Sequence, residues 1–335
     1  MDKQKSPIDF AVIAKKVIEK TSAGETRVLF RFFPVRGVAF DQANSEFFKG
    51  VLSAALQGVS SPISLTCVTL DNFPIIYSMY DVGLHDGLCQ EQVNICSRTI
   101  SGNFLLIACP FLHAESEAII KIDSVAAILR LSFGNFIAWP RFYEIMVNVE
   151  KQEPDMWFPQ RTLRMYDPKV DGPFLPDTKG EGNLEVDIRS LIFEIINGQG
   201  REHSLALSLI EDAAKEENAR KKVFLYFSAI QSISGCYKLN DLINIMKKHY
   251  KRHGDGWDIL KHHFGETLLL EPVTVLRHNV IHNGWDSKSF PILERYLQIL
   301  CLEVLESRLQ INSKNLLEKF IQIYGASWWM DGITV

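Results

Sequence analysis

A stretch rich in proline and glycine, residues 154–183, separates two parts of the chain that have different sequence patterns. It holds five prolines and three glycines. Proline fixes φ and lacks a backbone donor, and glycine loses more entropy on folding than other residues, so such a stretch interrupts helices and strands. We therefore predict a linker at 154–183 between an N-terminal domain, 1–153, and a C-terminal domain, 184–335.

The N-terminal part alternates between strand-like and helix-like segments. Apolar residues recur every three or four positions in 10–21 and 114–134, which predicts helices there, the second ending at Gly134. The strand candidates are rich in β-branched and aromatic residues and are bounded by turn-forming residues. They predict a mixed α/β domain and comprise residues 26–35, 63–70, 72–83, 92–100, 103–112 and 142–151.

The C-terminal part is a succession of amphipathic segments with short connections. Gly235 suits the end of one helix, and Pro272 suits the first turn of another. An α-helical bundle buries the apolar faces of so many short-linked helices, so the predicted fold class is α+β, a mixed α/β domain followed by an all-α domain. The predicted helices are 187–196, 203–217, 220–234, 240–252, 257–264, 271–282, 290–309 and 313–325.

The composition is that of a folded globular protein without a strong overall charge. Of 335 residues, 47% are hydrophobic and 23% charged, and the net charge is −4, so a nucleic-acid partner would need a local basic patch. The six cysteines form no C-x-x-C pair, which indicates free thiols and a reducing compartment. Because no signal peptide and no apolar run of membrane-spanning length is found, we predict a cytoplasmic protein without membrane contact.

The sequence "VLRHNVIHNG", residues 275–284, places Arg277, His278, Asn279 and His282 in an otherwise apolar helical segment that ends in an Asn-Gly step. On a helix, His278 and His282 are neighbours four residues apart with Asn279 beside them, whereas Arg277 falls on the apolar arc. A histidine can act as an acid or base near neutral pH, and an arginine fork suits a phosphate that gains negative charge. The alternative is structural, with Arg277 paired to a buried acid and His282 ending a helix.

Arg277, the polar His278 and the terminal His282 resemble the R-x4-H signature of the HEPN superfamily (higher eukaryotes and prokaryotes nucleotide-binding domains). In that family the signature lies in a late helix of an α-helical bundle. Residues 221–235, "KKVFLYFSAIQSISG", also resemble the aromatic-rich helix of the ApeA-like HEPN branch, which typically reads "FLLYWxALE". The resemblance covers residues 187–313.

This resemblance implies a metal-independent endoribonuclease of a bacterial defence or toxin type. Such proteins usually form homodimers through the helical domain, so that two R-x4-H motifs face one RNA cleft. By this resemblance His282 is the general acid and base, Arg277 stabilises the scissile phosphate, and His278 and Asn279 accompany them. The 2′-OH of the RNA attacks and leaves a 2′,3′-cyclic phosphate, with no cofactor. The N-terminal domain would bind a trigger ligand or protein.

Two positions depart from the family pattern. The family's glutamate at the end of "ALE" is Gln231 here, and the tyrosine that some HEPN toxins carry two residues after the histidine is Gly284. Gln231 leaves open a second hypothesis, a catalytically silent dimerisation or nucleotide-binding module. A third hypothesis places an enzyme site in the N-terminal domain. Its candidate residues, which follow no recognised spacing, are His85, Asp86, Cys89 and His113.

A local excess of basic residues lies between residues 220 and 263. This segment holds nine lysines and arginines against three aspartates, so it can neutralise RNA phosphates, although a solvated helix face is the alternative. The predicted RNA-binding residues are Lys247, Lys248, Lys251, Arg252 and Lys261. His249 and His253 have a spacing that can hold a metal ion, but the neighbouring lysines favour a solvated basic face, and no metal site is predicted.

Overall fold

Helices predominate in the described part of the computed structural model, and every regular element described from residue 188 onward is a helix. The structure describes residues 10–20, 24–35, 64–69, 103–110, 115–134, 143–150, 154–157, 169–170, 172–174, 188, 190–195, 203–216, 218–236, 239–252, 258, 290–311 and 316–325.

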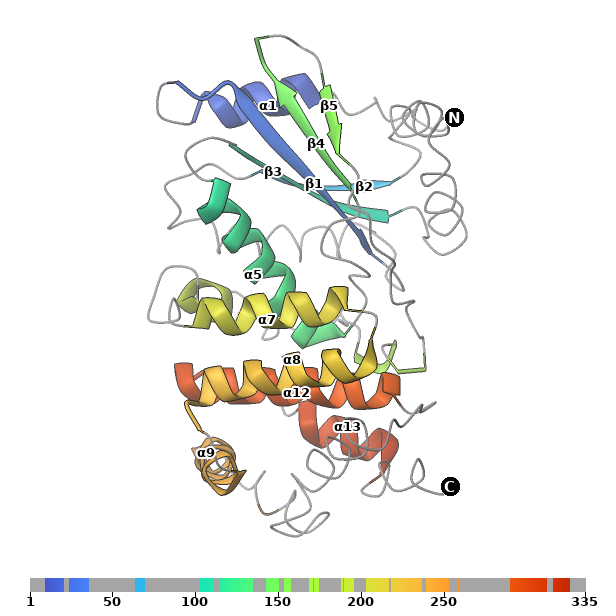
Figure 1. The fold of residues 1–335 in the computed structure, drawn as a ribbon, viewed down its shortest axis with the longest axis vertical. Helices are drawn as coiled ribbons and strands as arrows, with labels where there is room; N and C mark the ends of the chain where they lie inside the picture. Colours follow the sequence, from blue (N-terminus) through green and yellow to red (C-terminus); the bar gives the residue numbers. More distant parts are fainter. Residues whose placement is uncertain are drawn as a thin grey trace, which may run out of the picture.

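Five antiparallel strands form one sheet in the order β2-β3-β1-β4-β5 (Figure 1). The central strand pairs on both sides, and its Phe30 lies opposite Ala108 and Ile145. Because neighbours in the sheet are distant in sequence, the sheet brings separate segments together. The strands are β1 Arg27–Val35, β2 Ser64–Thr69, β3 Asn103–Pro110, β4 Tyr143–Asn148 and β5 Pro154–Trp157.

Both faces of the sheet are covered at its centre. Successive side chains of a strand point to opposite faces, so Val28 and Phe30 lie on one face and Leu29 on the other. All three are buried, and only Leu29 belongs to the large core that the helices form. Helix α1, Phe10–Ile18, contacts β1, β3 and β4 and buries its Ala14 and Val17.

The helices pack on one another to form the main hydrophobic core (Figure 1). Helix α12 contacts four of the other helices, α5, α8, α9 and α13, and α7 lies between α5 and α8. No described helix is both long enough and apolar enough to cross a membrane. The helices are α5 Glu115–Phe133, α7 Ser204–Lys215, α8 Ala219–Ser234, α9 Leu239–Arg252, α12 Phe290–Leu309 and α13 Leu316–Tyr324.

The ends of these helices follow local sequence signals. The Asn218 side chain caps α8 by accepting hydrogen bonds from the backbone N–H groups of Arg220 and Lys221 at 3.0 and 3.2 Å. Gly235 ends the same helix at φ 62°, and Gly134 ends α5 at φ 76°, left-handed conformations that glycine adopts without steric cost. Both glycine-terminated helix ends were predicted from the sequence and are confirmed.

The proline- and glycine-rich stretch is packed where the structure describes it. Its first four residues form β5, which the sequence pattern did not predict. Phe174 stacks on Phe320 of α13, and the Tyr324 hydroxyl donates to the carbonyl oxygens of Lys169 and Val170 at 3.0 and 3.2 Å. The stretch therefore pairs with the sheet at one end and packs on the helices further along. The division into two domains stays a prediction.

Candidate functional site

Four predicted catalytic residues, Arg277, His278, Asn279 and His282, lie outside the described residues, as does Lys261. The predicted strands at 72–83 and 92–100 and the predicted helix at 271–282 lie outside them too. The described helices nearest to the R-x4-H motif in sequence are α9 before it and α12 after it. These two helices contact each other in the main core.

Helix α9 carries the predicted RNA-binding lysines on its outer side. Lys248 and Lys251 are exposed, Lys247 is half-buried, and Arg252 is the last residue of the helix. On the opposite arc, apolar side chains that are three or four residues apart enter the core. These are Leu242, Met246 and Tyr250.

His249 does not lie on the solvated basic face that the sequence analysis predicted for it. Its side chain is fully buried, and Nε2 lies 3.3 Å from Oε2 of Glu303 on α12. His249 is three residues after Met246 and seven after Leu242, so helical geometry places it on their inward arc. The neighbouring lysines point elsewhere and do not decide its surroundings.

Lys222 also does not lie on the basic surface to which the sequence analysis assigned it. It is buried in α8, and its Nζ lies 3.4 Å from Oε1 of Glu294 and 5.9 Å from the centre of the Phe290 ring. Lys222 shares an arc with Tyr226 and Ala229, which are both buried. The Lys222 ammonium therefore pairs with a carboxylate inside the fold and does not add positive charge to the surface.

Gln231, where the sequence departs from the HEPN pattern, is exposed near the end of α8. Ile230 and Ile233, which come before and after Gln231 and lie on the inward arc of α8, are buried. A carboxylate at position 231 would thus also face away from the described core.

Helix α12 is buried on all sides from Leu293 to Glu306. A helix of this kind is expected to be apolar all round, and each buried polar side chain needs a partner. Five polar side chains of α12 are nonetheless fully enclosed. They are Glu294, Arg295, Gln298, Glu303 and Glu306.

A buried hydrogen-bond network joins α8 to the first half of α12. The Tyr226 hydroxyl donates to Oε1 of Glu294 at 3.2 Å and accepts from Nε2 of Gln298 at 3.1 Å. Burial, reinforced by the negative charge of Glu294, raises the pKa of Tyr226 well above its ordinary value. Tyr226 therefore stays a hydrogen-bond donor, and Glu294 is shared between this hydroxyl and the ammonium of Lys222.

Arg295 caps the C-terminal end of α5. Its Nη1 donates to the carbonyl oxygens of Leu131 at 2.9 Å and Arg130 at 3.3 Å, and its Nη2 donates to that of Ser132 at 3.0 Å. The last carbonyls of a helix lack intrahelical partners and carry the negative end of its dipole, so a guanidinium there is stabilising. The guanidinium also lies 4.5 Å from the centre of the Phe174 ring.

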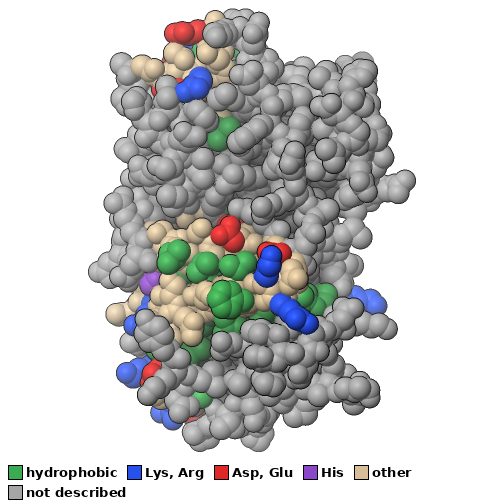
Figure 2. Space-filling view, in the orientation of Figure 1, with side chains coloured by type: hydrophobic (Ala, Val, Ile, Leu, Met, Phe, Trp, Pro, Cys, Tyr) green, Lys and Arg blue, Asp and Glu red, His purple; other side chains and the backbone are tan. Residues whose placement is uncertain are grey.

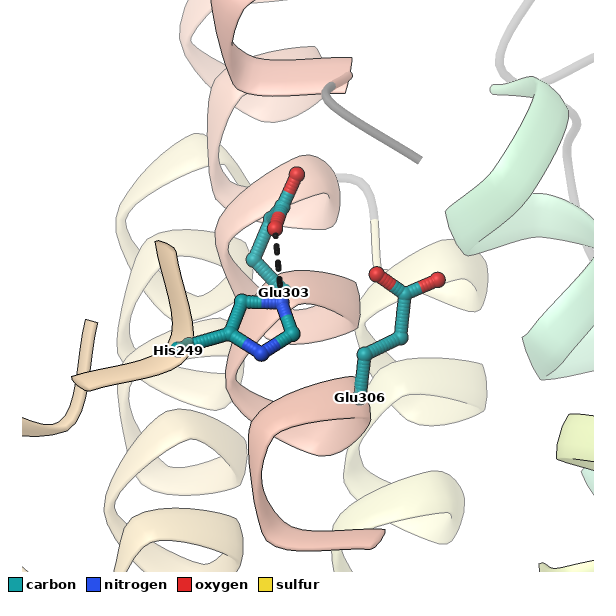
Figure 3. Close-up of side chains that lie close together, drawn as sticks. All are labelled: His249, Glu303 and Glu306. Carbon is teal, nitrogen blue, oxygen red and sulfur yellow. Dashed lines mark ion pairs between the residues drawn. The ribbon is translucent and has the colours of Figure 1, made fainter. Parts of the chain in front are cut away.

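A second polar group, the His249 cluster, joins α9 to the second half of α12 and consists of His249, Glu303 and Glu306 (Figure 3). All three side chains are fully buried, and their potential ligand atoms lie within 4.8 Å of one another. The backbone N–H of Leu317 donates to Oε1 of Glu303 at 3.5 Å. An imidazole and two carboxylates arranged in this way can share a proton or bind a cation.

The sequence contains one signal for this buried polar chemistry, which the sequence analysis did not use. At 100° per residue, Leu302 and Leu305 fall on the same side of α12 as Glu294 and Gln298. The helix therefore has no separate polar face, which is typical of a helix that is buried all round. Charged residues on such a helix are candidates for internal ion pairs or sites.

Comparison with known proteins gives no relative: no protein-family model, no curated protein and no solved structure matches this chain.

Proposed function

We propose that this chain is a HEPN-type endoribonuclease that cleaves RNA through Arg277 and His282. The observation that carries the proposal is the R-x4-H sequence between two helices, α9 and α12, of an all-α region. The aromatic-rich segment that resembles the ApeA-like branch forms helix α8 of the same region, and α8 packs directly on α12. The described helices on both sides of the motif support the proposal, and the motif itself lies outside the described residues.

The proposed reaction is an internal phosphoryl transfer. His282 removes the proton from the 2′-OH, the resulting oxygen attacks the phosphorus, and the bond to the 5′ oxygen breaks. The leaving 5′ oxygen takes a proton from a protonated His282, of the same or the second subunit. Arg277 stabilises the charge that develops on the phosphate, while His278 and Asn279 complete the polar set. The products are a 2′,3′-cyclic phosphate and a 5′-OH, and no metal or other cofactor takes part.

Helix α9 supplies the proposed RNA contacts. Its exposed Lys248 and Lys251 lie three residues apart on one side, spaced to follow a phosphate backbone. Replacing either lysine by alanine is expected to weaken RNA binding about equally for all sequences. Each replacement should also reduce the slope of log affinity against log salt concentration by about one. Filter binding at several salt concentrations measures the affinity and this slope. Unchanged salt dependence in the double variant would exclude α9 from the RNA contact.

The proposed homodimer has a candidate surface on α7 and α8. Leu205 and Phe224 are 62% and 57% exposed, and Figure 2 shows apolar side chains gathered in this part of the molecule. Exposed Asp212 on α7 and Arg220 and Lys221 on α8 give the same helices both signs of charge. A second copy related by a two-fold axis can cover the apolar side chains and pair opposite charges.

Light scattering tests this surface. We expect wild type to be a dimer and Phe224→Glu to be a monomer with little RNA cleavage. Ile323→Glu is the matched control, because Ile323 is an exposed apolar residue on α13, 41% exposed, away from α7 and α8. A Phe224→Glu chain that remains dimeric would rule out this surface.

The decisive test of the function is RNA cleavage by the purified full chain in the presence of EDTA. Wild type is expected to cleave, and His282→Ala and Arg277→Ala are each expected to lose activity by at least about 100-fold while their circular dichroism is unchanged. Arg308→Ala is the control, since Arg308 is exposed on α12 outside the motif. Equal cleavage by wild type and both motif variants would refute the proposal.

The second candidate is a catalytically silent HEPN-like module, which the amide at Gln231 favours. Growth of cells that express wild type or His282→Ala separates the two candidates. An active nuclease is expected to be toxic only as wild type, whereas a silent module gives equal growth. If wild type is silent, Gln231→Glu tests whether the missing carboxylate is the reason.

A further inference from the structure

We propose that His249, Glu303 and Glu306 form a buried binding site for a divalent transition-metal ion, which joins α9 to α12. This goes beyond the proposed function, because the proposed cleavage of RNA needs no metal. The ion would be structural, since all three side chains are fully buried and are carried by two helices, α9 and α12, that pack on each other (Figure 3).

The distances suit a metal ion of the size of zinc. Zinc lies about 2.0–2.2 Å from nitrogen and oxygen ligands, so two ligands of a tetrahedral site lie about 3.4 Å apart. Nε2 of His249 and Oε2 of Glu303 are 3.3 Å apart, which matches one edge of such a site. The remaining ligand atoms lie within 4.8 Å, a separation that rotation of the Glu306 carboxylate can shorten.

The types of donor atom indicate which class of metal would bind. One imidazole nitrogen with two carboxylate oxygens is typical of zinc and other divalent transition metals, whereas calcium and magnesium bind oxygen ligands almost exclusively. Three protein ligands leave a fourth position for a water molecule or another donor.

The charges of the cluster suit a divalent cation. Glu303 and Glu306 bring two fully buried carboxylates to one imidazole. A divalent ion bound by the three side chains would offset both negative charges.

Binding would fix the orientation of α9. His249 lies between Lys248 and Lys251 in sequence, and its side chain points inward while theirs point outward. A metal ion that holds His249 against α12 would therefore also hold the exposed lysines in one position. This links the internal site to the proposed RNA surface without placing the metal in the reaction.

Metal analysis of the full chain tests the proposal. Protein purified without chelator is expected to contain about one zinc or manganese ion per chain by elemental mass spectrometry. After removal of the metal, added Zn²⁺ is expected to raise the melting temperature. Glu306→Gln and Glu303→Gln should each lower Zn²⁺ affinity by about 10- to 100-fold. Glu294→Gln is the matched control, a buried glutamate of the same helix outside the cluster, and should keep the affinity.

Two results would overturn the proposal. One is wild-type protein without bound metal and without a change in melting temperature, which would leave only a His249–Glu303 ion pair. The other is Zn²⁺ affinity unaffected by Glu306→Gln and Glu303→Gln, which would place the ion elsewhere. If the variants fail to fold, Co²⁺ added to wild type gives a separate readout: the expected absorption bands are those of nitrogen and oxygen ligands, and a sulfur charge-transfer band would refute the site.

The His282→Ala chain keeps this test independent of the proposed nuclease. It is expected to bind Zn²⁺ like wild type while cleaving no RNA. Metal-free wild type that still cleaves RNA would leave the proposed function intact even if no metal site existed.

Discussion

The two halves of helix α12 are equally buried but use their polar residues differently. In the first half, Glu294 meets the ammonium of Lys222 and the hydroxyl of Tyr226, and Arg295 caps the end of α5. In the second half, Glu303 and Glu306 lie close to the imidazole of His249. The first half places opposite charges and dipoles together, whereas the second brings three potential metal ligands, two carboxylates and an imidazole, close to one another.

This difference indicates two roles. Matched and hydrogen-bonded groups fix how neighbouring elements pack, because removing one partner leaves the other buried without compensation. Two carboxylates and an imidazole are a set of donor atoms that suits a divalent transition metal. Substitutions in the first half should therefore lower stability whether or not metal is present, and substitutions in the second half should act mainly through the metal.

The largest effect is expected for Arg295→Met. The substitution removes the hydrogen bonds to three carbonyl oxygens at the end of α5 and should lower the free energy of unfolding by about 4 kcal/mol. Urea denaturation measures the change. Arg308→Met, an exposed arginine of the same helix, should change it by less than about 0.5 kcal/mol. A loss below about 1 kcal/mol for Arg295→Met would contradict the capping role.

Lys222→Met should lower the free energy of unfolding by about 3 kcal/mol, because it leaves the Glu294 carboxylate buried without its ammonium. The double variant Lys222→Met with Glu294→Gln removes both charges and keeps an acceptor for Tyr226. It should recover at least half of the loss, as measured by urea denaturation of both variants. If the two losses simply add, the buried pair is not coupled.

Tyr226→Phe should have a smaller effect, about 1–2 kcal/mol, since it deletes hydrogen bonds to Glu294 and Gln298 without removing a charge. Thermal and urea unfolding measure the change. Tyr250→Phe, in α9 beside the His249 cluster, allows the same stability change to be measured near the second half of α12. A loss for Tyr226→Phe that disappears in the Glu294→Gln background would show that the carboxylate is its main partner.

The effect that is smallest at neutral pH is a dependence of stability on alkaline pH. Burial raises the pKa of Cys301 and of Tyr226 above their ordinary values. Their contribution to stability is therefore complete below the pKa of the unfolded chain, about 8.5 for cysteine and about 10 for tyrosine, and is lost as pH rises above it. At pH 7 neither group contributes to this dependence.

Cys301→Ala isolates the thiol. Between about pH 8.5 and pH 10 it should remove up to about 1.4 kcal/mol per pH unit from the slope of stability against pH. Denaturation at a series of pH values measures the slope. An unchanged slope would mean that the thiol ionises as readily in the folded protein as in the unfolded chain.

Local sequence patterns predicted most of the described elements. The predicted helix at 290–309 has the bounds of α12, and the predicted strands at 26–35 and 103–112 contain β1 and β3. These predictions depend on periodicity and on caps such as Gly235, which act within a few residues. The strand β5 was missed because its four residues begin with a proline and contain no β-branched residue.

The arrangement of the buried groups could not be predicted in this way. His249 and Glu303 lie 54 positions apart in the sequence (303 − 249), and Arg295 donates to carbonyl oxygens more than 160 residues away. The sequence analysis instead placed His249 on a solvated basic face and counted Lys222 as a surface charge. Both errors arise because a helix of mixed polarity does not reveal which arc its neighbours will cover.

The sequence by itself determined the helices and strands and the R-x4-H motif that carries the proposed function, because these are set by residues close together in the chain. Only the tertiary structure decided that α12 is enclosed on all sides and that its charged residues meet partners from α5, α8 and α9. The physical reason is that burial and charge pairing depend on which faces of distant helices pack together, and hydrophobic packing specifies these faces only when the whole core forms.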